Sequence, residues 1–307
     1  MLWQQAMACH AAGGPGVFSK AFCRGRAAGC RGPQAMACQA AGVPVRVLKK
    51  NFAGAGRRVP KIKQMGWGHM MKNVLVTGAS GGIGQAIAAA FAQQGYGVAM
   101  QYHSQREQAE GLAGKIGAKA FRADVSQERD VEALFCAAEE AFGTIHVLVN
   151  NAGVSWRGLL THMPLAEWEH VFAVNTRGVF LCCRRALPPM IRRKEGAIIN
   201  ISSMWGRQGA SCEAAYSASK AAVIGLTQAL AQEEGPSGIR VNCIAPGVID
   251  TPMNSSLSPA DLAALAGDTP LQRAGTPQEV AQAALFLAES PFITGQTLGV
   301  DGGFLPG

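Results

Sequence analysis

One short stretch limits the fold of this chain more than any other: an apolar run that leads at once into a glycine-rich turn and a helical segment. The run is Asn73-Val74-Leu75-Val76-Thr77, the turn is Gly78-Ala79-Ser80-Gly81-Gly82-Ile83-Gly84, and alanine-rich residues 86–92 follow. Glycines allow a tight turn and let a pyrophosphate approach the helix N-terminus, where free N–H groups and the helix dipole favour anions. A strand before and a helix after the glycines indicate a dinucleotide site rather than an ordinary loop. The residues that we expect to contact the cofactor here are Gly78, Ser80, Gly82, Ile83 and Gly84.

The rest of the chain repeats this alternation. Apolar runs predict strands at 98–102, 120–125, 146–149 and 197–201, with helical stretches such as 131–142 between them. Strands that alternate with helices predict an α/β fold, a Rossmann-like doubly wound parallel sheet in a single domain over residues 71–307. Ligands of such sheets bind at the carboxyl ends of the strands. We therefore expect the cofactor to meet Asp124 and Val125 after the third strand, with Asp124 near the adenine amino group, and Asn151, Ala152 and Gly153 after the fourth.

The residues after the second strand bear on which nicotinamide cofactor binds. NAD-preferring sites usually place an Asp or Glu there to hold the ribose 2′-hydroxyl. This chain has His103-Ser104-Gln105-Arg106 instead. These residues include no carboxylate that would repel a 2′-phosphate, and Arg106 could attract this phosphate. The pattern therefore favours NADPH over NADH. The alternative is that Arg106 is a solvated residue at the start of a helix.

A serine, a tyrosine and a lysine follow the fifth strand at spacings that suit carbonyl chemistry. Tyr216 comes thirteen residues after Ser203, and Lys220 four residues later, on the same helix face. A phenol has an ordinary pKa of about 10, and a nearby ammonium lowers it. Tyr216 could then give a proton to a carbonyl oxygen that Ser203 holds, while hydride reaches the carbon. Lys220 could also bind the nicotinamide ribose. Alone, this four-residue spacing is more often a surface pair.

Together these motifs resemble the short-chain dehydrogenase/reductase family, of the type that includes 3-oxoacyl-[acyl-carrier-protein] reductases. The matching residues are Thr77-Gly78-x-x-x-Gly82-Ile83-Gly84, Asn150-Asn151-Ala152-Gly153, Asn175, Ser203, Tyr216, Lys220 and Pro246-Gly247. The resemblance implies a homotetramer, and it makes Asn175 a fourth catalytic residue that holds a water relaying protons to Lys220. It places Pro246, Gly247, Ile249 and Thr251 near the nicotinamide. It also makes residues 250–275 a mobile segment that closes over substrate.

The residues around the serine are similar to a narrower group, the elongation factor P 5-aminopentanone reductases of Gram-positive bacteria. The similar tract is Ser203-Met204-Trp205-Gly206-Arg207-Gln208-Gly209-Ala210-Ser211-Cys212-Glu213, together with residues 181–185. This makes Trp205 and Glu213 candidate substrate residues, since Glu213 could pair with the ammonium of an aminopentanone. The alternative for Glu213 is a helix N-terminal charge that the dipole favours. We expect a ketone that is carried on a protein, either acyl carrier protein or elongation factor P.

Residues 192–194, Arg-Arg-Lys, form a basic patch that could meet either of these acidic proteins or could simply be a solvated helix end. Two other functions stay open. One is an NAD-dependent secondary-alcohol dehydrogenase. The other is a non-catalytic, nucleotide-sensing interaction protein, which would be expected to have lost Ser203, Tyr216 or Lys220.

The first seventy residues differ in composition from the rest. They hold eleven Lys and Arg and no Asp or Glu, whereas 17 basic and 20 acidic residues follow them. The net charge of +8 therefore belongs to this extension, and we do not expect the protein to bind nucleic acid. We expect residues 1–70 to be disordered and favour a translation start at Met70 or Met71. A transit peptide and a basic tail are the alternatives.

The nine cysteines are irregularly spaced and form no C-x-x-C pair. This pattern predicts reduced thiols in a cytoplasmic protein without a metal site. No run of eighteen apolar residues occurs, so we expect no membrane segment.

Overall fold

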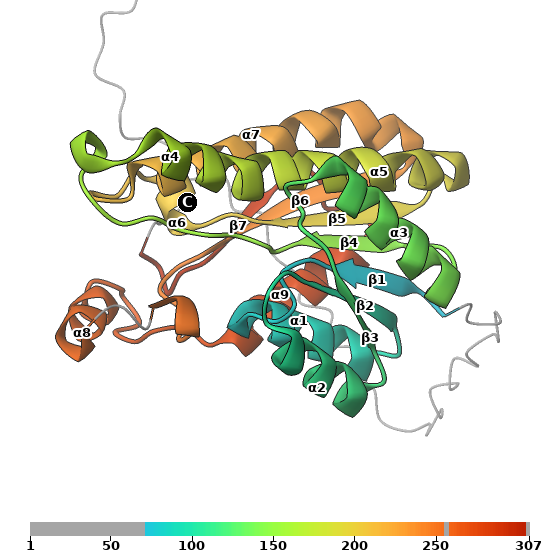
Figure 1. Ribbon diagram of the computed structural model, residues 1–307, viewed down its shortest axis with the longest axis horizontal. Helices are drawn as coiled ribbons and strands as arrows, with labels where there is room; N and C mark the ends of the chain where they lie inside the picture. The colour runs from blue at the N-terminus through green and yellow to red at the C-terminus, as the bar shows by residue number, and fades with distance from the viewer. Residues whose placement is uncertain (1–70, 255–257, 305–307) are drawn as a thin grey trace, which may run out of the picture. The chain divides into compact units, whose positions relative to one another are not determined.

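The computed structural model describes residues 71–254 and 258–304. The expectation of a disordered extension at 1–70 lies outside this range. The centre of the fold is one sheet of seven parallel strands, with the order β3-β2-β1-β4-β5-β6-β7 (Figure 1). The strands are β1 (Asn73–Val76), β2 (Gly97–Tyr102), β3 (Lys119–Arg122), β4 (Val147–Asn150), β5 (Gly196–Ile201), β6 (Ile239–Pro246) and β7 (Thr297–Val300). The doubly wound parallel sheet predicted from the sequence is confirmed.

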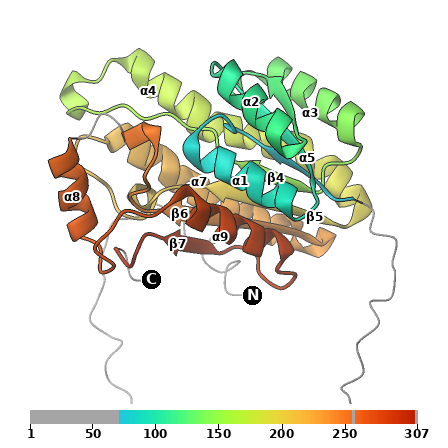
Figure 2. The ribbon, with the colours of Figure 1, turned by 90° about the horizontal axis from the view of Figure 1, so that it is seen from below.

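Helices cover both faces of this sheet (Figures 1 and 2). On one face lie α1 (Gly82–Gln93), α2 (Arg106–Ile116) and α9 (Pro277–Glu289). On the other lie α3 (Glu128–Phe142), α4 (Leu165–Phe172), the π-helical turn η2 (Ala173–Arg177), α5 (Gly178–Arg193) and α7 (Ala214–Glu234). The shorter elements are η1 (Leu160–His162), α6 (Met204–Arg207), η3 (Gly235–Ser237), η4 (Pro252–Asn254) and α8 (Pro259–Gly267).

The core is divided between the two faces because successive strand residues point to opposite sides. In β1, Leu75 packs with the side chains of α3, α5 and α7, whereas Val74 and Val76 pack with those of α1 and α9. All three are fully buried. This explains why the strands read as continuous apolar runs rather than as alternating ones.

One element differs from the sequence prediction. The third strand ends at Arg122, so Asp124 lies in the loop behind it rather than in the strand. There the Asp124 carboxylate accepts a hydrogen bond from the Ser126 N–H (2.9 Å), and the Asp124 N–H donates to the Asp130 carboxylate (2.9 Å). Such side-chain bonds compete with the strand ladder and end it. The helix of Tyr216 begins at Ala214, so Tyr216 and Lys220 lie in its first two turns.

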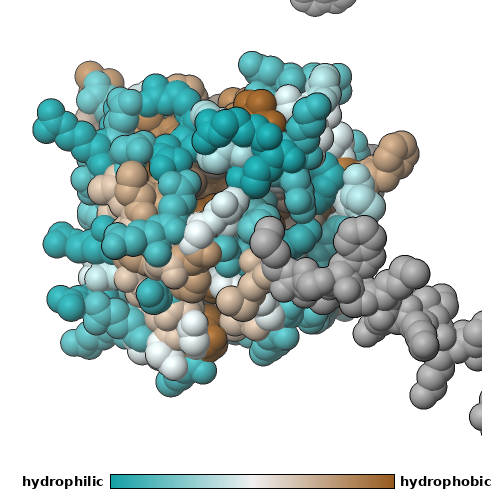
Figure 3. Space-filling view, turned by 90° about the vertical axis from the view of Figure 1, so that its right-hand side faces the viewer, coloured by the Kyte–Doolittle hydropathy of each residue, from teal (hydrophilic) through white to brown (hydrophobic). Residues whose placement is uncertain are grey.

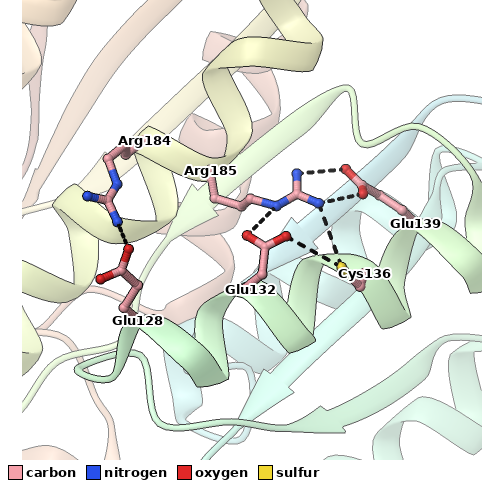
Figure 4. A network of polar contacts seen from close by, with 6 residues as sticks. All are labelled: Glu128, Glu132, Cys136, Glu139, Arg184 and Arg185. Carbon is pink, nitrogen blue, oxygen red and sulfur yellow. Dashed lines mark hydrogen bonds and ion pairs between the residues drawn. The ribbon is translucent and has the colours of Figure 1, made fainter.

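Ion pairs tie α3 to α5 on the outside of the sheet (Figure 4). The Arg185 guanidinium contacts Glu132 at 2.9 Å and Glu139 at 2.7 Å, and Arg184 pairs with Glu128. Cys136 lies within the same network and is one of five free thiols among the described residues. These contacts join two helices of one layer and lie outside the sheet's loop edge.

The face seen from the right of Figure 1 is mainly hydrophilic, with separate small hydrophobic areas (Figure 3). Over residues 71–254 and 258–304, no helix has the length and apolar character needed to cross a membrane.

Candidate active site

The strand order reverses between β1 and β4, so the loops after these two strands lie side by side at the carboxyl edge, which is where open α/β sheets bind ligands. Thr77 joins them. Its hydroxyl oxygen accepts hydrogen bonds from the N–H groups of Asn151 (3.0 Å) and Ala152 (3.1 Å). The Asn151 amide in turn donates to the carbonyls of Thr77 and Gly78, both at 3.0 Å. The two loops therefore form one rigid unit.

The glycine turn needs its glycines. Gly78 has φ +61°, and a Cβ there would lie 2.7 Å from the Ala152 Cα. A Cβ on Gly84 would overlap the Gly78 carbonyl oxygen, and one on Gly82 would come 3.0 Å from the Thr251 methyl group. Helix α1 starts here without a side-chain cap. A close backbone approach and an uncapped helix N-terminus fit a bound pyrophosphate.

Gln101 supports the same turn and was missed by the sequence reasoning. Its side-chain oxygen accepts from the Gly78 N–H (2.7 Å), and its amide donates to the Ala123 carbonyl (2.7 Å). The signal was available, because a glutamine in an otherwise apolar, fully buried strand needs a hydrogen-bond partner.

Two arginines lie near the ends of β2 and β3, where we expect the adenosine of the cofactor. Arg106 begins α2 with an exposed side chain and pairs with Glu110 at 2.8 Å. Arg122, which the sequence reasoning did not single out, is exposed at the end of β3, and its Nε donates to the His103 carbonyl at 3.4 Å. Burial would raise the pKa of Asp124, but hydrogen bonds from Ser126 and the nearby histidines lower it. Val125 is buried beside Asp124.

The structure brings Ser203, Tyr216 and Lys220 together. Ser203 caps the N-terminus of α6, where its hydroxyl accepts from the Trp205 N–H (3.1 Å), and the same hydroxyl acts to lower the pKa of the Tyr216 phenol. Lys220 lies one turn after Tyr216, with its Nζ 5.7 Å from the centre of the phenol ring. Tyr216 and Lys220 therefore lie on one face of α7, as the sequence predicted.

The electrostatics of this pair differ from the sequence expectation. Burial, and next the Glu213 carboxylate, raise the pKa of Tyr216 to about 12, while the Ser203 hydrogen bond and Arg157 act to lower it. Burial also lowers the pKa of Lys220 to about 8. The expected lowering of the tyrosine pKa by lysine is therefore wrong: the pKa is raised, and Lys220 is not among the groups that shift it. The Lys220 amine donates a hydrogen bond to the Ile201 carbonyl (2.9 Å). Its lowered pKa means that its charged form is less favoured than that of an exposed lysine.

Asn175 lies in the π-helical turn between α4 and α5 and is fully buried. Its side chain is bonded to both backbone groups of Val154, at 2.8 and 2.9 Å, and donates to the Ser219 hydroxyl at 3.0 Å. A Cβ on Gly153 would lie 3.2 Å from the Lys220 amine and 3.4 Å from the Asn175 carbonyl oxygen. Gly153 thus lies between these two side chains. Ser219, the hydrogen-bond partner of Asn175, was missed by the sequence reasoning.

The end of β6 supplies the residues expected at the nicotinamide. Gly247 packs so closely against the tail that a Cβ would lie 2.7 Å from the Asp301 Cα. Ile249 is buried and pairs with Gly275, and Thr251 faces Gly82 across the turn. Pro246 ends the strand. These residues and the glycine turn enclose the same edge of the sheet.

The two candidate substrate residues have partners within the protein. Glu213 directly precedes α7, is buried, and pairs with the Arg157 Nε at 2.8 Å. The carboxylate expected to meet a substrate ammonium therefore already has an internal cation. Trp205 packs edge-to-face on Phe304, with 5.5 Å between ring centres.

The basic patch at 192–194 lies at the opposite edge of the sheet. The Arg193 guanidinium donates to the carbonyl of Ile145, just before β4, to that of Glu195, just before β5, and to that of Pro189 within α5. Strands begin at that edge, whereas Ser203, Tyr216 and Lys220 lie at the edge where strands end. The patch is therefore poorly placed to present a carrier protein to Tyr216.

Comparisons with known proteins agree with this geometry. The family model described as enoyl-(acyl carrier protein) reductase matches residues 78–305. The 3-oxoacyl-[acyl-carrier-protein] reductase FabG of Staphylococcus aureus is 42% identical over 241 residues, covering 76% of this chain and 98% of that protein. The same enzyme of Chlamydia muridarum is 43% identical over 239 residues, covering 76% and 96%. The uncharacterized oxidoreductase YmfI of Bacillus subtilis is 38% identical over 243 residues, covering 76% and 99%.

Among solved structures, one described as a gluconate dehydrogenase from Agrobacterium tumefaciens superposes with a TM-score of 0.73 at 33% identity. It covers 77% of this chain and 96% of its own. The relatives and the matched sheet, glycine turn and Ser–Tyr–Lys group lead to one conclusion. The chain belongs to the short-chain dehydrogenase/reductase family and is an NAD(P)H-dependent oxidoreductase acting on ketone and alcohol groups.

Proposed function

We propose that the protein is an NADPH-dependent reductase that converts the ketone of a 3-oxoacyl thioester, carried on acyl carrier protein, into a secondary alcohol. The observation that carries this is the placement of Tyr216 beside Lys220, with the Ser203 hydroxyl acting on the same phenol, at the edge of the sheet that holds the glycine turn. The names of the relatives in Staphylococcus and Chlamydia support the thioester.

Each residue has a distinct part in the proposed reaction. The nicotinamide, when bound, supplies hydride. Ser203 holds the ketone oxygen through its hydroxyl, and Tyr216 delivers its phenolic proton to that oxygen. Lys220 binds the nicotinamide ribose and returns a proton to the phenolate, with Asn175 holding a water on the way. The phenol, whose pKa is raised to about 12, is a competent donor because it stays protonated at neutral pH.

For the cofactor, the glycine turn and α1 would hold the pyrophosphate, and the arginines at the second and third strands favour the 2′-phosphate. Residues 101–105 contain no acid that would repel it. Asp124 and Val125 would contact the adenine, and Ile249 and Thr251 the nicotinamide carboxamide. The preference for NADPH over NADH rests on these charges.

A second candidate substrate is the ketone of an aminopentanone modification on elongation factor P. It is supported by the resemblance of residues 203–213 and by the Glu213 carboxylate close to Tyr216. In that case the substrate ammonium would have to share Glu213 with Arg157. A neutral acyl chain requires no such exchange.

We also infer that the protein assembles as a homotetramer. A groove of about 960 Å³ runs along α4, η2 and α5 and includes the apolar side chains of Trp168, Phe172 and Phe180. Phe180 is 45% exposed and Leu165 on the same helical layer 70%. Sedimentation of the purified protein tests this inference, and a monomer would contradict it.

The proposed function is tested by NADPH oxidation with acetoacetyl thioester and, in parallel, with aminopentanone-modified elongation factor P. Tyr216→Phe should reduce turnover by about a hundredfold or more, while NADPH still binds. Undiminished turnover in this variant would overturn the mechanism. Faster turnover on the modified factor than on the thioester would replace the first substrate by the second.

A further inference from the structure

Two segments meet beside Tyr216 and are joined by an ion pair. Arg157 lies in the loop between β4 and η1, and Glu213 is the residue directly before α7. The Arg157 Nε and the Glu213 carboxylate are 2.8 Å apart, with side chains 35% and 11% exposed. A backbone hydrogen bond from the Gly158 N–H to the Cys212 carbonyl (2.9 Å) joins the same segments. We call this pair and its two loops the rim clamp.

Further contacts hold the conformation of the segment directly before α7. Cys212 has φ +62°, a left-handed conformation that residues with a side chain seldom adopt. The Ala210 N–H is bonded to the Ser217 hydroxyl at 3.2 Å, which folds the segment before Glu213 back onto the first turn of α7. The position of Glu213 relative to Tyr216 is therefore determined by several contacts rather than by one.

The charges around the Tyr216 phenol come from three parts of the fold. Glu213 stands before α7, Arg157 in the loop after β4, and Lys220 one turn further along α7. The neutral Ser203 hydroxyl reaches the phenol from the start of α6. Glu213 raises the pKa of the phenol and Arg157 lowers it, whereas the Lys220 amine is bonded to the Ile201 carbonyl.

A buried carboxylate without a counter-charge is costly and makes proton loss from an adjacent phenol harder. A guanidinium close by has the opposite effect on the phenol. In the pair, the exposed Arg157 guanidinium compensates the buried Glu213 carboxylate, and their opposite effects on the phenol partly cancel. The rim clamp thus joins a structural role to an electrostatic one.

We propose that Arg157 and Glu213 are positioning residues, which together hold the rim over Tyr216 and set the pH range in which it delivers its proton. The inference rests on the proposed role of Tyr216 as proton donor. Neither residue has to touch the ketone, because both act through the phenol.

The test is the pH profile of kcat/KM for ketone reduction, which falls where Tyr216 loses its proton. Glu213→Gln removes the negative charge that raises the pKa of the phenol, so the alkaline limb should move to lower pH, by roughly one unit. Arg157→Gln leaves Glu213 uncompensated, so the limb should move to higher pH. The double variant should return close to the original profile, and Arg157→Lys should retain it.

Shifts of both single variants in the same direction, or an unmoved limb in both, would overturn the proposal, because a purely structural contact predicts no opposite signs. Glu139→Gln is the matched control, since Glu139 pairs with Arg185 between α3 and α5 and should leave the limb in place. NADPH affinity measured by fluorescence shows that each variant is folded. Activity in Tyr216→Phe would refute the proposed function itself, whereas an inactive Tyr216→Phe with unmoved limbs would refute the rim clamp alone.

Discussion

The amine of Lys220 donates a hydrogen bond of 2.9 Å to the backbone carbonyl of Ile201, at the end of strand β5. The side chain is 4% exposed and its charge has no carboxylate partner among the interactions that shift its pKa. Burial therefore decides its behaviour and lowers its pKa from 10.5 to about 8. A lysine with this pKa can exchange protons near neutral pH, as the role proposed for Lys220 requires.

This burial predicts a dependence of stability on pH. The folded-state pKa of Lys220 lies below the unfolded one, so between pH 8 and 10.5 the unfolded chain binds more protons. The free energy of unfolding should therefore rise with pH across this window, by up to about 3 kcal/mol from this group. Below pH 8 the cost of the buried charge is present in full. Urea denaturation of wild type and Lys220→Met at both ends of the window measures it, and an equal rise in the two proteins would contradict it.

The glycine turn gives a second prediction. Gly84→Ala should lower the free energy of unfolding by about 2 kcal/mol and weaken NADPH binding, because the new Cβ would lie 2.7 Å from the Asn151 amide and 2.8 Å from the Ala79 Cα. Gly111→Ala is the matched control. It lies in the exposed part of α2 with open space around it, and should be neutral or raise the free energy of unfolding by about 1 kcal/mol. Equal effects of the two substitutions would argue against the close packing.

The third prediction concerns the hydroxyl that joins the loops after β1 and β4. Thr77→Val keeps the shape of the side chain but leaves the N–H groups of Asn151 and Ala152 without this acceptor. The free energy of unfolding should fall by about 2 kcal/mol. Thr77→Ser retains the hydroxyl and should lose much less. If serine destabilises as much as valine, the methyl group and not the hydroxyl matters at this position.

Much of the fold follows from local sequence signals. Apolar runs placed β1, β2, β4 and β5 to within one residue at each end, and the spacing of Tyr216 and Lys220 placed both on one helix face. The end of β3 was wrong, because the hydrogen bonds of Asp124 with Ser126 and Asp130 form only once the loop has folded.

The ion pairs and pKa shifts of the site could not be predicted from the spacing of residues along the sequence. Arg157 and Glu213 are 56 residues apart and meet only through the sheet order. Burial, which decides the direction of the Tyr216 and Lys220 pKa values, depends on every element packed around them. Arg122 was missed for a related reason, because only the pairing of β2 with β3 places it opposite Tyr102 at the same edge.

The last prediction concerns cofactor preference at that edge. Arg106 and Arg122 come from neighbouring segments, and a 2′-phosphate carries negative charge that either guanidinium can meet. Arg106 already pairs with Glu110, an exposed contact at 2.8 Å that is worth little and can be exchanged for a phosphate. Arg106→Gln and Arg122→Gln should each raise the Kd for NADPH, by roughly tenfold for loss of one charged contact, and leave the Kd for NADH unchanged.

Cofactor fluorescence measures both constants without any ketone present. Lys115→Gln serves as the control, since this cation lies in the last turn of α2, away from the strand ends. His103→Asp should shift the preference toward NADH, because a carboxylate directly after β2 repels the phosphate and can accept from the ribose hydroxyl. If both arginine variants weaken NADH binding as much as NADPH binding, the arginines stabilise the fold of this edge rather than bind the 2′-phosphate. The proposed preference for NADPH then loses its basis.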